Sequence, residues 1–489
     1  MARPRTAPLS GTALLVVLAV CLSAAVASVV AVPTVPLYDE FSWLVWGREL
    51  AHHVIGPHQP FVIAGGASWK PLPVLFTTIF SFFGSGAVAL WLVFVRTVGL
   101  LGLWPAYRLG SRLGTSERWR AAGPMGGVLA ATAVVLTRGW FGFMLGATSE
   151  PLTITAALLC VDRAIGGRRL PALTAGVALA LMRPEAGVLV ALYALWCLRR
   201  GRGAARRLLV VAEVLLVPVA WIAPPWLAGG SPLQAATRAT QFGGDYGHAL
   251  ATIALTRAEH VVVAPVLVTA LASVAFALWR GERPVIALAL VSVAYVAVIE
   301  LMTLQGFPGL GRFMLPAGAI VSVLAGAGLA RLAALARGSV APAMIAVALV
   351  SFSAPYCLPP ISQVRSDRHA AAIALLGHDS LTSAVTRAGG AEGVLPCATS
   401  SATVNWRETP ELAWILGVPL DRVHPVPAHA NSIRSAGLAF LAPGQPALGN
   451  SPSQLGSGLR VHPLWRDGPW SIMRVTRSHD PHVDHCVGD

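Results

Sequence analysis

The residues best suited to chemistry are a few carboxylates and one lysine. Asp39 and Glu40 follow the first apolar run by a few residues, and Lys70 is the only lysine among 36 basic residues. A carboxylate can act as a general base that takes a proton from a hydroxyl group. An ammonium is a compact point charge suited to a phosphate oxygen in a tight site, whereas a guanidinium is a planar fork. These residues therefore predict proton transfer beside a phosphate group.

The same residues also have plain structural interpretations. Asp39 and Glu40 stand at the expected start of a short helix, where an acidic side chain stabilises the N-terminus by about 1 kcal/mol. Lys70 could also be left by chance in a chain so rich in arginine. The sequence alone leaves both interpretations open.

Acidic residues are scarce, and several of them are predicted to lie on one side of a membrane. Ionisable groups near a bilayer are costly unless they are paired or solvated, which makes them functional candidates. The carboxylates predicted in outer loops or at outer ends of spans are Asp39, Glu40, Glu150, Glu185, Asp245, Glu259 and Glu300. We therefore expect a charged site on that face.

Four of the remaining candidates are predicted at turns or span ends. Glu150 opens a span and could simply cap it, while Arg183 and Glu185 flank a proline in a tight turn and could form a local ion pair. Arg312 follows a glycine-rich stretch, which lets the backbone and the guanidinium approach an anion, although it could also anchor the interface. All four are candidates for substrate binding.

Asp245 and His248 are predicted to lie in a flexible outer loop. Carboxylate and imidazole groups can bind metal, but two residues at this spacing are weak evidence for a metal site. We include them as substrate-binding candidates, and a divalent ion is left open. No CxxC pair or other zinc-type spacing is present.

The composition indicates a polytopic α-helical membrane protein. The chain has 489 residues, of which 55% are hydrophobic and 12% charged, and its mean hydropathy is +0.66. The net charge of +14 comes from arginines in short loops between apolar spans. The positive-inside rule explains this pattern, so the charge reflects topology and gives no indication of a nucleic-acid partner.

Apolar runs and arginine-rich breaks predict about eleven membrane-spanning helices in the plasma membrane. The first run, 11–32, is long enough to span and is interpreted as an uncleaved helix, with the N-terminus cytoplasmic and the C-terminus outside. The outer loop 33–84 contains two short segments, 40–53 and 71–83, that suit helices lying on the membrane surface.

The spans end near residue 358, which divides the chain into two predicted domains. Residues 1–358 form the transmembrane core, and 359–489 form a small mixed α/β domain outside the membrane, of roughly 130 residues. A disulfide between Cys397 and Cys486 is plausible there. The sequence has no visible internal repeat, which weakens a transporter interpretation.

The order of these features resembles the GT-C superfamily of integral membrane glycosyltransferases. It is similar above all to the protein mannosyltransferase and lipid A aminoarabinose transferase branch, and to the actinobacterial arabinosyl and mannosyl transferases. The resemblance covers about residues 10–340. It is carried by the acidic pair at residues 39–40, Trp69-Lys70-Pro71, Ser149-Glu150-Pro151 and the turn at Arg183.

The resemblance implies roles for several residues. Asp39 would be the catalytic carboxylate, with Glu40 as its partner or alternative, and Lys70 would contact the lipid phosphate. Glu150 and Arg312 match an acidic residue before proline and a basic residue in a late outer loop. Trp69 replaces a carboxylate that some relatives have, which weakens the case for a metal site of their kind.

We therefore expect a transferase that moves a sugar from a polyprenyl-phosphate donor to a glycan, lipid or protein acceptor of an actinobacterial-type cell envelope. The resemblance implies direct displacement with inversion and no nucleotide site, and Walker or Rossmann glycine motifs are absent from the sequence. Two alternatives remain: a transporter or flippase of a lipid-linked substrate, and a non-catalytic envelope scaffold.

Overall fold

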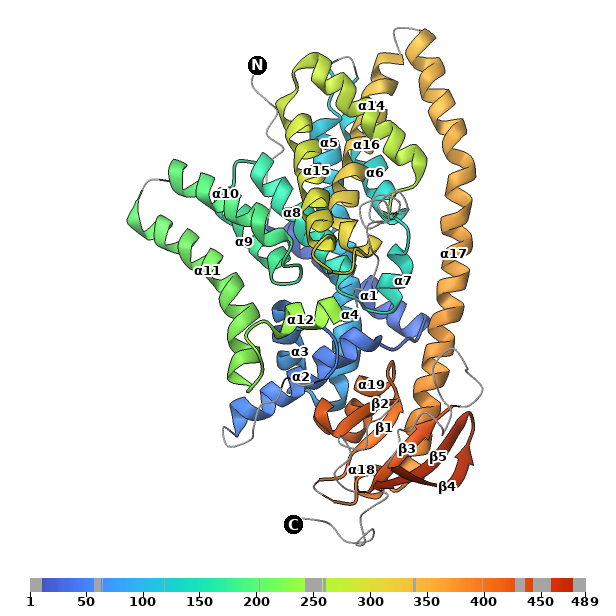
Figure 1. Cartoon of the computed structure of the whole chain (residues 1–489). Coiled ribbons are helices and arrows are strands. Elements are labelled where there is room, and N and C mark those ends of the chain that lie inside the picture. Colours follow the sequence, from blue (N-terminus) through green and yellow to red (C-terminus); the bar gives the residue numbers. More distant parts are fainter. Residues whose placement is uncertain are drawn as a thin grey trace.

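The fold is mostly helical, with a small sheet near the C-terminus (Figure 1). The computed structural model describes residues 11–56, 63, 65–117, 119–201, 203–241, 257, 261–336, 340–397, 399–426, 436–442 and 459–477. The helices before the sheet are α1 (Gly11–Ala31), α2 (Tyr38–Ile55), α3 (Pro71–Ser81), η1 (Gly84–Gly86), α4 (Ala87–Leu101), α5 (Leu103–Leu113), α6 (Ala122–Val135), α7 (Trp140–Leu145), α8 (Glu150–Ile165), α9 (Arg169–Ala180), α10 (Ala186–Arg200), α11 (Ala204–Leu227), α12 (Gln234–Gln241), α14 (Ala264–Arg280), α15 (Arg283–Thr303), η3 (Gly311–Met314), α16 (Leu315–Ala336), α17 (Val340–Arg387) and α18 (Gly390–Val394).

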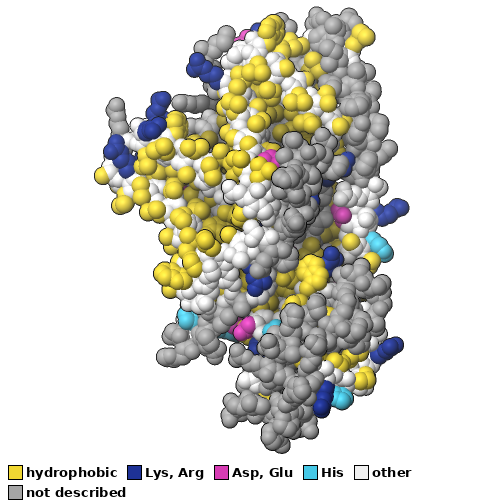
Figure 2. Space-filling view, in the orientation of Figure 1, with side chains coloured by type: hydrophobic (Ala, Val, Ile, Leu, Met, Phe, Trp, Pro, Cys, Tyr) yellow, Lys and Arg dark blue, Asp and Glu magenta, His cyan; other side chains and the backbone are white. Residues whose placement is uncertain are grey.

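Several helices are long and apolar enough to cross a membrane. Among the described residues there are five such segments, and shorter apolar helices accompany them. The five are 11–31, 84–113, 204–227, 283–303 and 311–336. Hydrophobic side chains cover much of the surface of the helical part in Figure 2, as expected of a surface that faces lipid. The chain is thus a multi-pass membrane protein, and the number of eleven spans stays a prediction.

Small residues let the central helices pack closely. A Cβ atom added to Gly110 of α5 would collide with the backbone at Gly126 of α6, and one added to Gly326 of α16 would collide with the backbone at Ala130. Close approach through glycine and alanine is the usual way in which helices associate in a membrane. These contacts join α5, α6 and α16 into the centre of the helical part.

The two short helices predicted in the first outer loop are present as α2 and α3. They lie at the end of the helical part that faces the sheet (Figure 1). Thr77 Oγ1 of α3 donates a hydrogen bond to the Trp43 carbonyl of α2 over 2.7 Å. A Cβ at Gly47 would lie 2.6 Å from the Thr77 carbonyl carbon, so α2 and α3 are in direct backbone contact.

The predicted C-terminal mixed α/β domain is confirmed in architecture. Its described elements are β1 (Ala402–Asn405), α19 (Thr409–Leu416), η4 (Leu420–Arg422), β2 (Val423–Val426), β3 (Gly437–Leu441), β4 (Leu459–Asp467) and β5 (Trp470–Arg477). The strand order is β2-β1-β3-β5-β4, with β1 parallel to both neighbours and β5 antiparallel to β3 and β4.

Helix α17 connects this domain to the helical part. It runs without a break along one side of the molecule and down to the sheet, so the predicted boundary at residue 358 falls inside it (Figure 1). A second connection comes from Arg48 of α2, whose guanidinium donates to the carbonyl oxygens of Val418 over 2.7 Å and Trp414 over 3.3 Å. The sheet domain is therefore held against the end of the helical part where α2 lies.

Candidate active site

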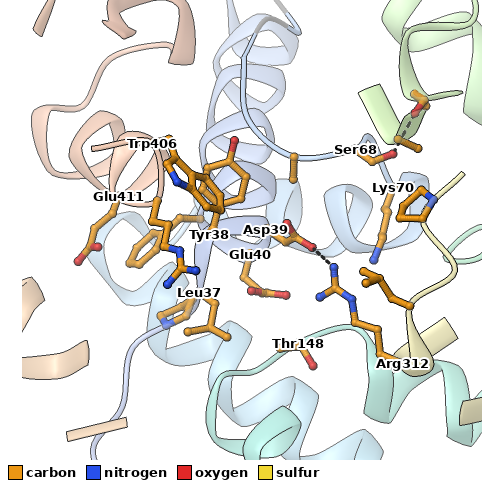
Figure 3. A pocket seen from close by; sticks show the side chains of 18 of the residues that line it. Leu37, Tyr38, Asp39, Glu40, Ser68, Lys70, Thr148, Arg312, Trp406 and Glu411 are labelled. Carbon is orange, nitrogen blue, oxygen red and sulfur yellow. Dashed lines mark hydrogen bonds and ion pairs between the residues drawn. The ribbon is translucent and has the colours of Figure 1, made fainter. Parts of the chain in front are cut away.

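Most of the predicted site residues line one cavity between the helical part and the C-terminal domain. The cavity has a volume of about 1010 Å³. The predicted residues that line it are Asp39, Glu40, Lys70, Arg183, Glu185 and Arg312. Figure 3 shows four of them, Asp39, Glu40, Lys70 and Arg312. Glu150 contacts two of the arginines without lining the cavity. Asp245 and His248 lie outside the described residues.

Each of these side chains stands at or near the beginning of a helix. Asp39 and Glu40 are in the first turn of α2, and Lys70 directly precedes α3, which begins with proline. Glu150 is the first residue of α8, and Arg312 lies in η3 before α16. Acidic side chains stabilise helix N-termini, and the same termini favour bound anions, so the fold collects polar groups at this end of the helices.

Backbone contacts bring the separate loops together. The Leu72 N–H donates to the Leu181 carbonyl over 3.3 Å, which joins the start of α3 to the turn that holds Arg183. The Ala67 N–H donates to Ser42 Oγ of α2 over 3.1 Å. Lys70 is thus fixed relative to both α2 and the turn between α9 and α10.

A chain of ion pairs runs from α8 to α2. Arg183 donates to Glu150 Oε1 over 2.6 Å, and Arg312 Nε lies 3.8 Å from the same oxygen. Arg312 Nη2 in turn lies 3.5 Å from Asp39 Oδ2. The Glu150 side chain is 1% exposed, whereas those of Asp39 and Arg312 are 26% and 36% exposed. Glu150 therefore pairs with both arginines on the side away from the cavity, while Asp39 and Arg312 line the cavity.

Lys70 is almost fully buried at the cavity wall. Its Nζ donates to Ser149 Oγ over 2.8 Å and lies 4.8 Å from the centroid of the Trp43 ring. Burial, together with the nearby Arg183, lowers the pKa of Lys70 to about 8. The ammonium has a single hydroxyl as hydrogen-bond acceptor among the described residues, so an anion in the cavity would improve its environment.

Two acidic side chains of the site are buried without full compensation. Burial and the neighbouring Asp39 raise the pKa of Glu40 well above its usual value, and burial also raises the pKa of Glu185. Glu40 Oε2 has no hydrogen-bond partner among the described residues. Glu40 and Glu185 are therefore protonated more readily than an ordinary glutamate, whereas Asp39 and Glu150 lie within ion-pair distance of arginines.

The C-terminal domain contributes cavity residues that the sequence analysis missed. They come from the junction of β1 and α19 and from α17, and those used below are Asn405, Trp406, Arg407, Glu408, Glu411 and His378. Polar residues between a short strand and a helix carry no pattern that separates a cavity wall from an ordinary surface loop. Only the position of the domain over α2 reveals their role.

The structure bears on the predicted disulfide and on a possible metal site. Cys397 is disulfide-bonded, and Cys486 lies outside the described residues, so the pairing of these two cysteines stays a prediction. Within the described ranges, no group of three or more His, Cys, Asp and Glu side chains has the arrangement of a metal site.

Comparison with known proteins gives a match in structure but none in sequence. No family model and no curated protein matches the chain. The solved structure of ArnT from Cupriavidus metallidurans bound to undecaprenyl phosphate superposes with a TM-score of 0.51 and 14% identity, covering 95% of this chain and 98% of that one. This chain has the GT-C fold. The resemblance predicted from the sequence is thereby confirmed for the fold.

A second GT-C structure is also similar. It is the Archaeoglobus fulgidus oligosaccharyltransferase tethered to an acceptor peptide, with a TM-score of 0.46 and 15% identity, covering 83% of this chain and 63% of that one. The assignment of the GT-C fold depends on the ArnT comparison, which spans nearly the whole of both chains.

Proposed function

We propose that this GT-C protein transfers a sugar from a polyprenyl-phosphate donor to an acceptor on the extracytoplasmic side of the plasma membrane. The observation that carries the proposal is that a carboxylate and three cationic side chains, Asp39, Lys70, Arg183 and Arg312, line one cavity. The cavity lies at the end of the membrane helices, where a lipid-linked phosphate would reach it. The ArnT structure with the same fold holds undecaprenyl phosphate.

The reaction would be a single displacement. Asp39 accepts the proton of the acceptor hydroxyl, and the hydroxyl oxygen forms a bond to the anomeric carbon of the donor sugar. The bond between that carbon and the phosphate oxygen breaks, and polyprenyl phosphate leaves with the electron pair. Attack from the face opposite to the leaving group inverts the anomeric configuration.

The cationic side chains would stabilise the leaving phosphate. Charge develops on the phosphate oxygen as the bond breaks, and buried cations interact strongly with it because water is largely excluded. Lys70 is 8% exposed and is buried at the cavity wall, whereas the Arg312 side chain is 36% exposed. Cationic side chains at this position suit a donor whose phosphodiester has one negative charge.

Asp39 is a better candidate for the base than Glu40. The Asp39 side chain is 26% exposed and lines the cavity, so an acceptor hydroxyl group can reach it, and it lies 3.5 Å from the Arg312 guanidinium. Glu40 is 2% exposed, and burial and the neighbouring Asp39 raise its pKa, which disfavours its ionised form. We infer that Glu40 contributes to the wall of the site and does not act as the base.

Two other functions are less well supported. A transporter would be expected to hold its charged site near the middle of the membrane, whereas these residues collect at one end of the helices, near the sheet domain. A non-catalytic scaffold would not be expected to have Asp39 and Lys70 in the wall of one cavity. The shared cavity therefore favours the transferase.

The proposal is tested by incubating the protein in lipid with radiolabelled polyprenyl-phosphate sugars and an extract of cell-envelope acceptors. Pentose and hexose donors are compared, each with and without a chelator to detect a need for a divalent ion. Label transfer from at least one donor supports the proposal. Binding of every donor without transfer in any condition would move the assignment to a transporter or scaffold.

A further inference from the structure

The wall of the cavity formed by the C-terminal domain contains an aromatic surface that the donor chemistry does not use. The Trp406 side chain follows β1 and is 40% exposed. Tyr38 of α2 packs edge-on against it, with 5.4 Å between ring centroids and 71° between planes. Both rings line the cavity (Figure 3), and Tyr38 precedes Asp39 directly in the chain.

Polar side chains line the cavity beside this aromatic pair, and the guanidinium carbon of Arg407 lies 5.2 Å from the centroid of the Trp406 ring. Glu408 and Glu411, from the start of α19, line the same cavity. His378 Nδ1 lies 2.6 Å from Glu411 Oε1, and its ring stacks on Phe41 of α2 at 5.9 Å. The Asn405 amide donates to Glu408, and its own Oδ1 is buried without a partner among the described residues. The carboxylates are thus oriented by neighbouring side chains.

These groups are distinct from those that would hold the phosphate. The cationic side chains of the proposed donor site come from the loops before α3 and α10 and from η3, whereas Trp406, Glu408 and Glu411 come from the C-terminal domain. Asp39 belongs to the helix that touches both groups. The cavity therefore has the cationic side of the proposed donor site and a second, aromatic side that carries Glu408, Glu411 and one arginine, Arg407, with the proposed base between them.

We propose that Tyr38, Trp406, Glu408 and Glu411, here called the acceptor wall, bind the terminal sugar of a glycan acceptor. This inference rests on the proposed function and adds the chemical class of the acceptor. A flat indole ring provides apolar area for the C–H face of a sugar ring, and carboxylate oxygens accept hydrogen bonds from its hydroxyl groups. A sugar that contacts Tyr38 and Trp406 would present a hydroxyl group toward Asp39.

A lipid or peptide acceptor fits this wall less well. An acyl chain has no hydroxyl or amide group to donate hydrogen bonds to Glu408 and Glu411, and it would cover these polar side chains with hydrocarbon, which is costly. A peptide that bound here by adding a strand would need a free edge on β1, the strand that leads into Trp406, and β1 is paired on both sides. The combination of aromatic and acidic groups favours a polyhydroxylated acceptor.

The test measures glycan binding separately from sugar transfer. The full-length protein in nanodiscs is titrated with soluble oligosaccharides of arabinose, mannose, galactose and N-acetylglucosamine, and binding is followed by saturation-transfer NMR. The variants are Trp406→Ala and Glu411→Gln. Trp465→Ala is the matched control because Trp465 is 37% exposed on β4 of the same domain and does not line the cavity.

We expect at least one oligosaccharide to bind, and we expect Trp406→Ala to weaken that binding about tenfold or more, as losses of buried aromatic anchors do. Trp465→Ala should bind as the wild type does, and all variants should bind undecaprenyl phosphate within about twofold of the wild type. In transfer assays the loss should appear mainly in the KM for the acceptor.

Two results would overturn the proposal. One is that no oligosaccharide binds to the wild type, and the other is that Trp406→Ala binds glycan as well as Trp465→Ala does. If glycan binding depends on Trp406 but no donor sugar is ever transferred, the acceptor wall stands as a glycan-binding site and the proposed transferase function fails.

Discussion

Replacement of Asp39 by Asn should remove most of the transferase activity while leaving the site assembled. Asparagine has nearly the same shape and can still accept a hydrogen bond from Arg312, which lies 3.5 Å from Asp39 Oδ2. It cannot take the acceptor proton. General-base catalysis contributes about 10²- to 10⁴-fold, so kcat should fall by that factor, or by about 3 to 5 kcal/mol in activation free energy.

Donor binding should respond in the opposite direction. The substitution removes a negative charge beside Arg312, and Coulomb's law gives about 1 kcal/mol for unit charges 3.5 Å apart at a water-like dielectric constant. Both side chains are partly exposed, so this weak limit applies. Undecaprenyl phosphate should therefore bind equally well or up to about fivefold more tightly.

The assay compares single-turnover sugar transfer and lipid-phosphate binding in the wild type, Asp39→Asn and Glu49→Gln. Glu49 is the control because it lies on the same helix, pairs with Arg48 at 3.2 Å and does not line the cavity. Transfer by Asp39→Asn within about threefold of the wild type would refute the role of Asp39 as base. Loss of both transfer and binding would indicate a structural role instead.

Three further predictions concern the lysine, the buried ion pair and the contact between α2 and α3. The pKa of Lys70 is lowered to about 8, so its positive charge is present below that pH and is lost above it. The affinity of the wild type for undecaprenyl phosphate should therefore fall as pH rises from 7 to 9, whereas the affinity of Lys70→Arg should not. Equal pH profiles of the two proteins would contradict the assignment of Lys70 to the phosphate. Arg183→Ala removes the 2.6 Å partner of the buried Glu150 carboxylate, so it should destabilise the fold by about 3 kcal/mol or more and lower the apparent Tm. The double variant Arg183→Ala, Glu150→Gln should recover part of this loss. An unchanged Tm in Arg183→Ala would contradict the prediction. Gly47→Ala should lower the Tm and the activity because the added Cβ collides with α3. Gly187→Ala in α10 is the control, because its Cβ meets no atom within 4 Å and should change neither quantity. Equal Tm and activity in the two variants would show that the backbone contact between α2 and α3 is unimportant.

Much of the proposed donor side of the site could be predicted from the sequence. Charged side chains are costly in a membrane, so the few carboxylates and the single lysine were candidates for a site, although helix capping and chance stayed open as explanations. The order of loops then indicated which of them would share a face. Asp39, Lys70, Arg183 and Arg312 are indeed brought to one cavity, although 273 positions separate Asp39 from Arg312 in the chain.

The C-terminal side of the cavity could not be predicted in the same way. Trp406, Glu408 and Glu411 lie in a polar stretch that would look the same on any soluble surface. Their function as a wall depends on how the domain docks, through α17 and through the hydrogen bonds of Arg48 to the segment after α19. The full length of helix α17 was not predicted either. Its apolar character ends near residue 358, where the sequence indicated a domain boundary, whereas its helical backbone continues to Arg387.

The most direct test of the central claim is the fate of a donor with separate labels on its sugar and its phosphate. The wild-type protein in liposomes is supplied with this donor and the acceptor that works best. A transferase should release one polyprenyl phosphate for every sugar that appears on the acceptor, and Asp39→Asn should release almost none. Movement of intact donor across the bilayer without release of polyprenyl phosphate would contradict the proposed function and favour a flippase.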